Sequence, residues 1–492
     1  MPRRLTLVLA ALILIGARPD PPVFDLSDYS GSWTQFDGNA GGRKPRSIIT
    51  QQNVNELDVA WQVALPEPSD GSPVYVSGIE TRRGTLNLLI VSTMAGRLVA
   101  INAENGARVW QTTPPEGPRW TTSSPAIDPT HSYVFGYSLD GYVHRYELAT
   151  GKEAIGNGFP ALITLKGDVE KGSSNISIAT ARDKRTFLYM TIAAYPDPGD
   201  DGDYQGHLVT VDIKSGEQHV FNALCADADM HFALGDCYAQ QAGIWARAGA
   251  VYDPVTDRVF ATTGNGPYTA LDGGHDWGSS VVALRPDGTT DRGTPLDSYT
   301  PENFQELTDE DLDLSSTTIE ILPTFNKNWP RLGVQSGKDG RLRLLNLENL
   351  SGNGGPAHLG GELQIVDLPQ GHMVMTQPQA WLDAGKTWVF VANNHGVAAF
   401  ELIANEDGDP QLVLRWKSDF GGTTPIIVNR VLYLAAPHRF VALRPTTGAV
   451  LWEDNTIGDI HWQSPIIVND TVYLTENGGY VTAYSLSTTL RR

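Results

Sequence analysis

A short glycine-bounded motif recurs along most of this 492-residue chain, and its recurrence leaves few folds open. The clearest copies begin at Gly96, Gly141 and Gly206, and each runs through an alternating apolar strand to a second glycine ten residues later. Looser copies follow, at residues 280–288, 340–352, 396–408, 440–448 and 479–484. Two short apolar strands precede each copy, so the unit has four antiparallel strands, as one β-propeller blade does. The sequence therefore predicts an all-β propeller of eight blades; seven blades with added decoration are the alternative.

The ends of the chain predict how the ring closes. The eighth copy has no outer strand after it, and the segment Leu57–Val63 near the N-terminus has the pattern to supply one. Its Trp61 occupies the position of the tryptophans that follow other copies, namely Trp110, Trp416 and Trp452. Closure by an N-terminal strand removes the exposed edge of an open array. We interpret these repeated tryptophans as packing between blades and not as a platform for a ligand.

Composition excludes some classes of function. Only 19% of residues are charged, the chain has 50 glycines and 31 prolines, and the formal net charge is −20. Phosphate neutralisation needs clustered Lys and Arg, so this balance argues against a nucleic-acid partner and against docking on an anionic membrane. It fits a soluble protein whose copies repel one another.

The N-terminus predicts export. Arg3 and Arg4 precede an apolar run over residues 5–15, and small residues follow at Gly16 and Ala17. This is the pattern of a signal peptide, and the run is too short for a comfortable transmembrane helix. We predict a signal peptide over residues 1–17, an N-terminal extension over 18–50 and the propeller over 51–492. An uncleaved anchor is the alternative.

Export places the protein in the periplasm or outside the cell, where disulfides persist. No further segment is long and apolar enough to span a bilayer. The two cysteines, Cys225 and Cys237, are therefore predicted to pair and to close a short loop.

In its fullest copies, over residues 98–110 and 441–452, the repeat resembles that of propellers that bind pyrroloquinoline quinone (PQQ), the quinoprotein alcohol dehydrogenases. The likeness is carried by Ala100, Gly106 and Trp110, and again by Gly448 and Trp452. It covers nearly the whole predicted mature chain and is closest to uncharacterised secreted PQQ-like repeat proteins. Non-catalytic scaffolds share the repeat, among them the propeller subunit of the outer-membrane β-barrel assembly machinery.

The resemblance implies a catalytic site at the mouth of the central funnel. The segment Thr262–Gly266 is similar to one whose asparagine binds Ca²⁺ in the family, which implies Asn265 as a metal ligand. The acidic run that contains Asp311 and Asp313 lies where the family keeps the base that takes the substrate's hydroxyl proton, with Asp311 the first choice. Lys338, just before an Asp-Gly turn, stands where a family cation contacts the quinone.

Polar and aromatic residues before several inner strands complete this hypothesis. Arg119, Trp245, Arg247 and Trp462 would lie near the propeller axis, where an aromatic floor with Arg donors suits a planar, anionic quinone. Packing of the narrow inner strands is the alternative interpretation.

Two departures from the family oppose the enzymatic hypothesis. The family's metal-binding glutamate is missing from residues 194–204, where an Asp-rich insertion stands, and the family's adjacent cysteine pair is absent. Two functions therefore remain open. One is a PQQ- and Ca²⁺-dependent dehydrogenase of a small or polymeric alcohol, and the other is a non-catalytic scaffold for protein or glycan partners.

Overall fold

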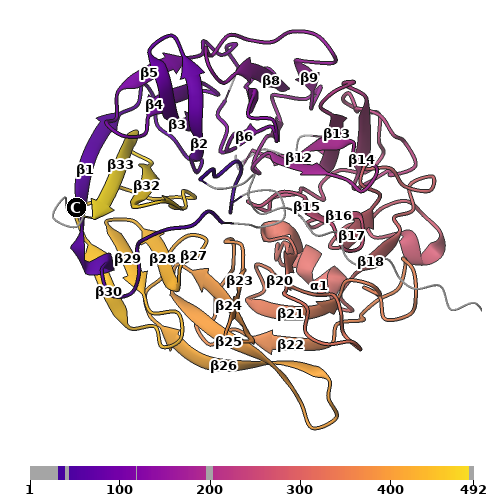
Figure 1. Cartoon of the computed structure of the whole chain (residues 1–492). Helices are drawn as coiled ribbons and strands as arrows, with labels where there is room; N and C mark the ends of the chain where they lie inside the picture. The colour runs from indigo at the N-terminus through magenta and orange to yellow at the C-terminus, as the bar shows by residue number, and fades with distance from the viewer. Residues whose placement is uncertain (1–30, 39–43, 118, 196–202, 487–492) are drawn as a thin grey trace, which may run out of the picture.

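Eight four-stranded blades surround a central axis in the computed structural model, which describes residues 31–38, 44–117, 119–195 and 203–486 (Figure 1). The first four blades are formed by β2 (Val74–Thr81), β3 (Gly84–Ser92), β4 (Leu98–Asn102) and β5 (Arg108–Gln111); β6 (Ala126–Ile127), β7 (Tyr133–Tyr137), β8 (Tyr142–Glu147) and β9 (Ala161–Leu162); β11 (Ser177–Thr180), β12 (Thr186–Ala194), β13 (His207–Asp212) and β14 (Gln218–Asn222); and β15 (Val251–Asp253), β16 (Arg258–Thr262), β17 (Val281–Leu284) and β18 (Asp297–Tyr299). The next three are formed by β19 (Glu320–Ile321), β20 (Leu332–Ser336), β21 (Arg341–Asn346) and β22 (Gln364–Asp367); β23 (Gln379–Asp383), β24 (Lys386–Asn393), β25 (Gly396–Ala404) and β26 (Pro410–Ser418); and β27 (Ile426–Val428), β28 (Val431–Ala436), β29 (Arg439–Leu443) and β30 (Val450–Asp454). The predicted blade count is confirmed.

The eighth blade contains both ends of the ring. It joins β31 (Ile466–Val468), β32 (Thr471–Glu476) and β33 (Tyr480–Leu486) to the N-terminal strand β1 (Leu57–Ala64), which pairs antiparallel with β33. The register runs from Leu57 opposite Leu486 to Ala64 opposite Tyr480. The predicted closure by an N-terminal strand is thus confirmed, and it leaves no edge between the first and last blades.

The repeated tryptophans join neighbouring blades, as predicted. Each indole Nε1 donates to a backbone carbonyl of the next blade round the ring: Trp61 to Ala103 at 3.2 Å, Trp110 to Leu148 at 2.8 Å, Trp416 to Pro445 at 2.8 Å and Trp452 to Leu57 at 3.1 Å. The motif glycine of the next blade lies against the indole face. A Cβ atom on Gly151 would come within 2.6 Å of the Trp110 ring. Glycine is therefore needed there for close approach as well as for its φ of +68°.

We expect Gly151→Ala to lower the free energy of unfolding by about 2–4 kcal/mol, because a left-handed backbone and overpacking against Trp110 both cost energy. Gly408→Ala is the matched control, since Gly408 also has positive φ but nothing lies within 4 Å of the added Cβ. It should cost only the backbone strain of about 1–2 kcal/mol. Chemical denaturation of both variants measures the difference, and equal losses would contradict the inter-blade role of the glycine.

The described part of the chain has few helices, and they lie in the connections between strands. They are η2 (Val54–Glu56), η3 (Ala270–Asp272), α1 (Phe304–Asp309) and η4 (Leu314–Ser316). Within the described ranges, no helix has the length and apolar character needed to cross a membrane. Residues 1–17, on which the predicted signal peptide depends, lie outside the described ranges.

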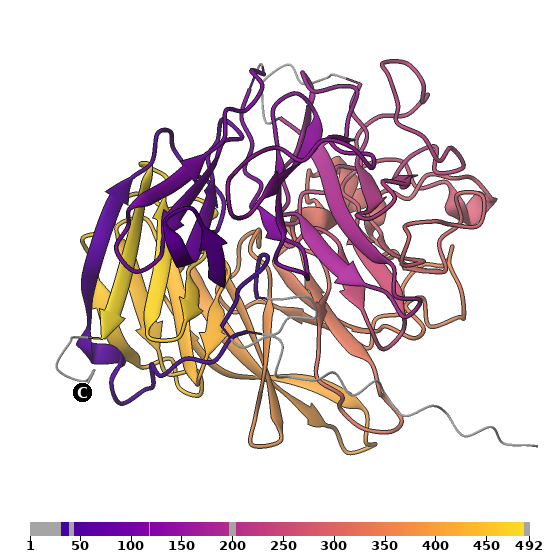
Figure 2. The same cartoon turned by 45° about the horizontal axis from the view of Figure 1, so that its top comes forward.

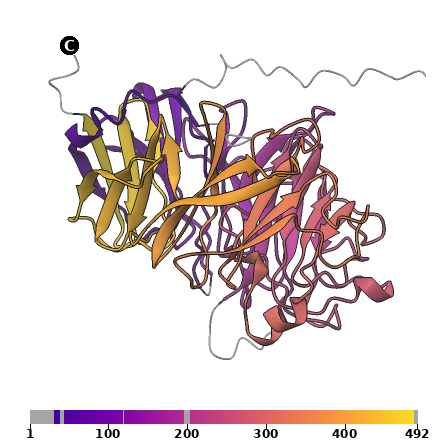
Figure 3. The same ribbon diagram turned by 90° about the horizontal axis from the view of Figure 1, so that it is seen from below.

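The two faces of the ring differ. Because neighbouring strands are antiparallel, the segments that lead into the inner strands and the loops that follow the second strands meet at one end of the ring, here called the funnel face. The loops after β16 and β20 and the segment before β19 all lie there. Figure 2 shows the blades arranged around this axis in a tilted view. Seen from below, α1 and the indigo segment around η2 lie at opposite faces of the ring (Figure 3).

Residues 33–38 and 44–51 lie along the axial channel, toward the face opposite the funnel. Trp33 pairs with Tyr75 of the first blade through two backbone hydrogen bonds of 2.8 Å. Thr34 accepts from the backbone of the second blade, Gln35 from that of the third, and Ile49 from the side chain of Asn429 in the seventh. The described parts of the N-terminal extension, residues 31–38 and 44–50, therefore pack on the propeller and link blades that are distant in the sequence.

Candidate functional site

The side chain of Asp313 is fixed in a cradle on the funnel face. It precedes η4 in the connection from the fourth to the fifth blade, and its Oδ1 accepts from the backbone N–H of Asn265 at 3.0 Å. Gly264 lies directly against it, so that any Cβ at that position would overlap the carboxylate. Lys338, in the turn after β20, places its Nζ 2.6 Å from Asp313 Oδ2. Glycine at position 264 is thus required by the packing of Asp313.

Asp311 joins the same group from a more open position. Its Oδ1 lies 3.2 Å from Lys338 Nζ and accepts from Asn265 Nδ2 at 3.1 Å. Its side chain is 82% exposed, against 7% for Asp313, and its φ of +55° is rare for a residue that is not glycine. We call Asn265, Asp311, Asp313 and Lys338 the carboxylate cluster. Four predicted site residues from three separate segments therefore meet at one place.

The pKa shifts of Asp313 and Lys338 suit a proton transfer at the carboxylate cluster. Burial raises the pKa of Asp313, although the ammonium of Lys338 opposes this shift. Burial alone would lower the pKa of Lys338, but its contacts with Asp313 and Asp311 outweigh that effect and raise it. Lys338 therefore stays positively charged, while Asp313 binds a proton more readily than an exposed aspartate does. A carboxylate with these properties can act as a general base.

Arg247 lies near the axis, where it binds three blades together. Its Nη2 donates to the carbonyls of Thr122 at 2.6 Å and Asp70 at 3.3 Å, and its Nη1 donates to Thr122 Oγ1 at 2.9 Å and to the carbonyl of Ser173. Its Nε has no partner among the described residues. The guanidinium lies 5.9 Å from the centroid of the Trp462 ring. Most N–H groups of Arg247 therefore donate to backbone carbonyls, and the Nε–H remains to bind a ligand.

A lysine that sequence reasoning missed lies beside Arg247. Lys171 belongs to β10 (Glu170–Lys171), which pairs with the end of β12 and continues the inner edge of the third blade. The Lys171 side chain is buried and its Nζ lies 5.4 Å from the Trp120 ring centroid, with no acceptor or ion pair among the described residues. Burial, reinforced by the charge of Arg247, lowers its pKa to about 8. Its only sequence signal was a position just before an inner strand.

The other predicted cofactor residues surround these cations. Arg119 lies 4.7 Å from the Tyr195 ring centroid, and Trp120 packs edge-on against the same ring. Trp245 is half-buried, with its indole against the backbone of Gly243. Gly243 in turn accepts from Gly264 N at 2.9 Å, so this segment connects the carboxylate cluster to Arg247. We call Arg119, Lys171 and Arg247, with their aromatic neighbours, the cation cluster.

The disulfide loop supports the same region. Cys225 and Cys237 are joined by a disulfide, with their Cα atoms 6.1 Å apart. The chain after this loop reaches Ala242, whose N–H donates to the carbonyl of Asn265 at 2.7 Å. The loop therefore leads directly into the segment that holds Asn265.

The two clusters have the chemistry of a site for an anionic cofactor and a hard cation. The buried cations and aromatic faces of the cation cluster suit a planar anion. Asn265 Oδ1 is buried, and no described residue donates a hydrogen bond to it. The neighbours of Asn265 are carboxylates, as they would be for an oxygen ligand of a hard cation. Within the described ranges no three His, Cys, Asp or Glu side chains form a metal-binding group. The Asp-rich insertion at 196–202 lies outside those ranges.

Comparison with known proteins gives a match to one family of β-propeller domains. A family model described as the β-propeller domain of glucose, ethanol and alcohol dehydrogenases, PQQ, matches residues 33–290, just over half of the chain. No curated protein matches the sequence.

Solved structures share the fold at low identity. A europium-containing methanol dehydrogenase is 14% identical, with a TM-score of 0.65 over 93% of this chain and 98% of its own. A quinohemoprotein alcohol dehydrogenase from Comamonas testosteroni is 15% identical, with a TM-score of 0.65 over 94% of this chain and 81% of its own. A related enzyme from Pseudomonas putida is 14% identical, with a TM-score of 0.64 over 93% of this chain and 81% of its own. With the family match over residues 33–290, the chain belongs to the PQQ family of dehydrogenase β-propeller domains.

Proposed function

We propose that the protein is an exported, PQQ-dependent dehydrogenase that oxidises an alcohol, with a divalent cation such as Ca²⁺ at its site. The observation that carries this proposal is the meeting of Asn265, Asp313 and Lys338, which come from three segments and are the residues that the sequence resemblance implies for the site. The missing glutamate and cysteine pair, which had favoured a scaffold, do not prevent this arrangement.

Asp313 is the base in this proposal, in preference to Asp311. It is buried and fixed by Asn265 and Lys338, while Asp311 is largely exposed. A general base works best when its proton affinity is raised and its position is fixed. Asp313 takes the proton of the alcohol hydroxyl, and Lys338 holds the carboxylate in place and neutralises it in the resting state.

A bound quinone would supply the acceptor for the two electrons and the hydrogen that leave the carbinol carbon. Lys171 and the free Nε of Arg247 would bind its carboxylates, and Trp245 and Trp462 would lie beside its rings. Asn265 Oδ1 would bind the cation next to Asp311 and Asp313. Burial of an unpaired lysine costs energy that an anionic ligand recovers, which is why Lys171 is central to cofactor binding.

The test begins with binding of PQQ to the full chain in the presence of Ca²⁺, followed by dye reduction over a panel of small and polymeric alcohols. We expect saturable binding with a shift in quinone absorbance, and dye reduction with at least one alcohol. Lys171→Met should weaken PQQ binding about tenfold to a hundredfold, as loss of a charged contact does. Lys184→Met, at an exposed site, is the control and should bind normally.

Absence of both binding and dye reduction would overturn the proposal and favour the scaffold hypothesis. Binding without reduction of dye by any alcohol would keep the cofactor but reject the alcohol substrate. Equal binding by Lys171→Met and the wild type would remove Lys171 from the cofactor site.

A further inference from the structure

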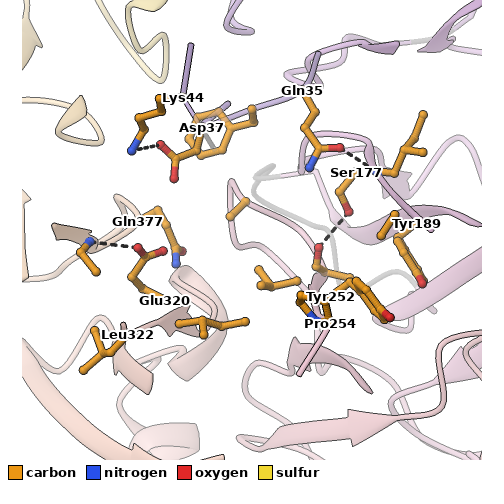
Figure 4. Close-up of a pocket in the computed structure, with 18 of the residues that line it drawn as sticks. Gln35, Asp37, Lys44, Ser177, Tyr189, Tyr252, Pro254, Glu320, Leu322 and Gln377 are labelled. Atoms are coloured by element: carbon orange, nitrogen blue, oxygen red, sulfur yellow. Dashed lines mark hydrogen bonds and ion pairs between the residues drawn. The ribbon is translucent and has the colours of Figure 1, made fainter. Parts of the chain in front are cut away.

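A cavity of about 360 Å³ lies in the axial channel, on the side away from the funnel. Inner strands of the third to sixth blades form its walls, and residues of the N-terminal segment cover it, as Figure 4 shows. Several lining residues, among them Pro254, Pro323 and Lys44, are partly exposed, so the cavity communicates with solvent. Side-chain hydrogen bonds between Gln377 and Thr318 lie between it and the funnel.

One carboxylate in this cavity has no matching positive charge. Glu320 Oε1 accepts from the backbone N–H of Ala380 at 2.9 Å, and no hydrogen bond or ion pair of the described residues reaches Oε2. The nearby Asp37 already has its cation, because Lys44 Nζ lies 2.9 Å from Asp37 Oδ1 and also donates to Gln379 at 2.8 Å. Figure 4 shows Lys44 turned to Asp37, with Glu320 facing the open space.

The remaining cation at the cavity is also paired. Arg331 Nε donates to Asp253 Oδ2 at 2.9 Å, and both its side chain and that aspartate are largely buried. The titratable groups that face Glu320 are therefore Asp37 and Lys44 of the N-terminal segment, Arg331 from the loop before β20, and Tyr189 and Tyr252 of the opposite wall. Burial, with the charge of Asp37 adding to it and that of Lys44 opposing it, raises the pKa of Glu320 to about 8.

Most of the other lining residues are apolar, among them Ile176, Ile178, Leu322 and Phe36. Polar side chains such as Gln35 and Gln377 lie between them. A lone carboxylate at the edge of an apolar, partly aromatic cavity selects a ligand with one positive charge and a hydrocarbon body. An ammonium ion pairs with Glu320 once its proton has left, whereas an anion would oppose that ionisation and would also lie near the Asp37 carboxylate.

We propose that this cavity is a binding site for a small organic ammonium ion, whose charge pairs with Glu320 and whose apolar body lies against the walls from the third to fifth blades. The site is separate from the quinone site, and its occupancy does not depend on the proposed dehydrogenase activity. Because Phe36, Asp37 and Lys44 line the cavity opposite the inner strands, a bound ligand also joins these residues to the strands.

The test uses benzylammonium as the probe, with benzamide and benzoate as neutral and anionic controls of similar shape. Calorimetric titration of the full chain, without added quinone, should show one saturable site that prefers benzylammonium over both controls by at least tenfold. At pH 7 binding should release a proton from Glu320, which appears as a dependence of the heat on the buffer. The affinity should rise as pH increases to about 8, the pKa of Glu320, and then level off.

Glu320→Gln should weaken benzylammonium binding at least tenfold, whereas Glu217→Gln at an exposed site should not change it. Glu320→Asp keeps the charge and should retain binding better than Glu320→Gln. This comparison separates an effect of the charge on binding from an effect of the substitution on folding. Equal affinity for benzylammonium and benzamide, or full binding by Glu320→Gln, would overturn the proposal. Because no quinone is present, neither result bears on the dehydrogenase.

Discussion

Asp313→Asn is expected to lower the turnover number for dye reduction by about 10²- to 10⁴-fold, the usual contribution of a general base. PQQ binding should remain, since the contacts proposed for the quinone come from the cation cluster. The substitution keeps the shape of the side chain and its acceptance of the Asn265 N–H, so the contact with Gly264 is kept, while the ion pair with Lys338 is lost. Steady-state kinetics with an active alcohol measure the loss, and quinone absorbance measures retained binding.

Asp311→Asn is the matched control, because Asp311 contacts the same Lys338 but is largely exposed. We expect it to reduce turnover by less than tenfold. In the wild type, activity should fall as pH decreases through the raised pKa of Asp313, since the protonated carboxyl cannot accept the hydroxyl proton. A larger loss in Asp311→Asn than in Asp313→Asn would reverse the assignment.

The sequence predicted much of the fold because a propeller repeats its own signal. Each motif glycine marks a turn, and each motif tryptophan requires a neighbour, so the order of the blades and the closure by β1 follow from local pattern. The carboxylate cluster was expected for a different reason, namely the resemblance to the PQQ propellers, which implied a site at the funnel mouth. In the structure Asn265 and Lys338 follow β16 and β20, the two aspartates precede β19, and these strand ends meet at one face.

The choice between Asp311 and Asp313 was not available from the sequence. Both are aspartates in one acidic run, and only the packing of Asp313 on Gly264 separates a buried carboxylate from an exposed one. Lys171 and Glu320 were missed because their neighbours come from other blades. The environment of each depends on how the ring brings distant segments together, which no local pattern encodes.

Arg247 illustrates the same limit, because the sequence suggested a cofactor ligand and the structure shows a guanidinium that also holds the axis together. We expect Arg247→Met to lower the free energy of unfolding of the apoprotein by about 3–5 kcal/mol. The carbonyls of Asp70, Thr122 and Ser173 would lose a charged donor while they remain buried. Thermal and denaturant unfolding without quinone would measure this loss.

Arg185→Met is the control for loss of an arginine, since Arg185 forms exposed ion pairs with Asp183 and Asp287 and should contribute at most about 1 kcal/mol. If Arg247→Met left the apoprotein as stable as this control but abolished PQQ binding, Arg247 would act as a ligand alone. If both the stability and the binding of PQQ fell, Arg247 would have two roles. It would stabilise the inner segments of the blades near the axis, and it would bind the cofactor through Nε. That second outcome is the one the geometry favours, because the donors used for the backbone fix the direction of the remaining one.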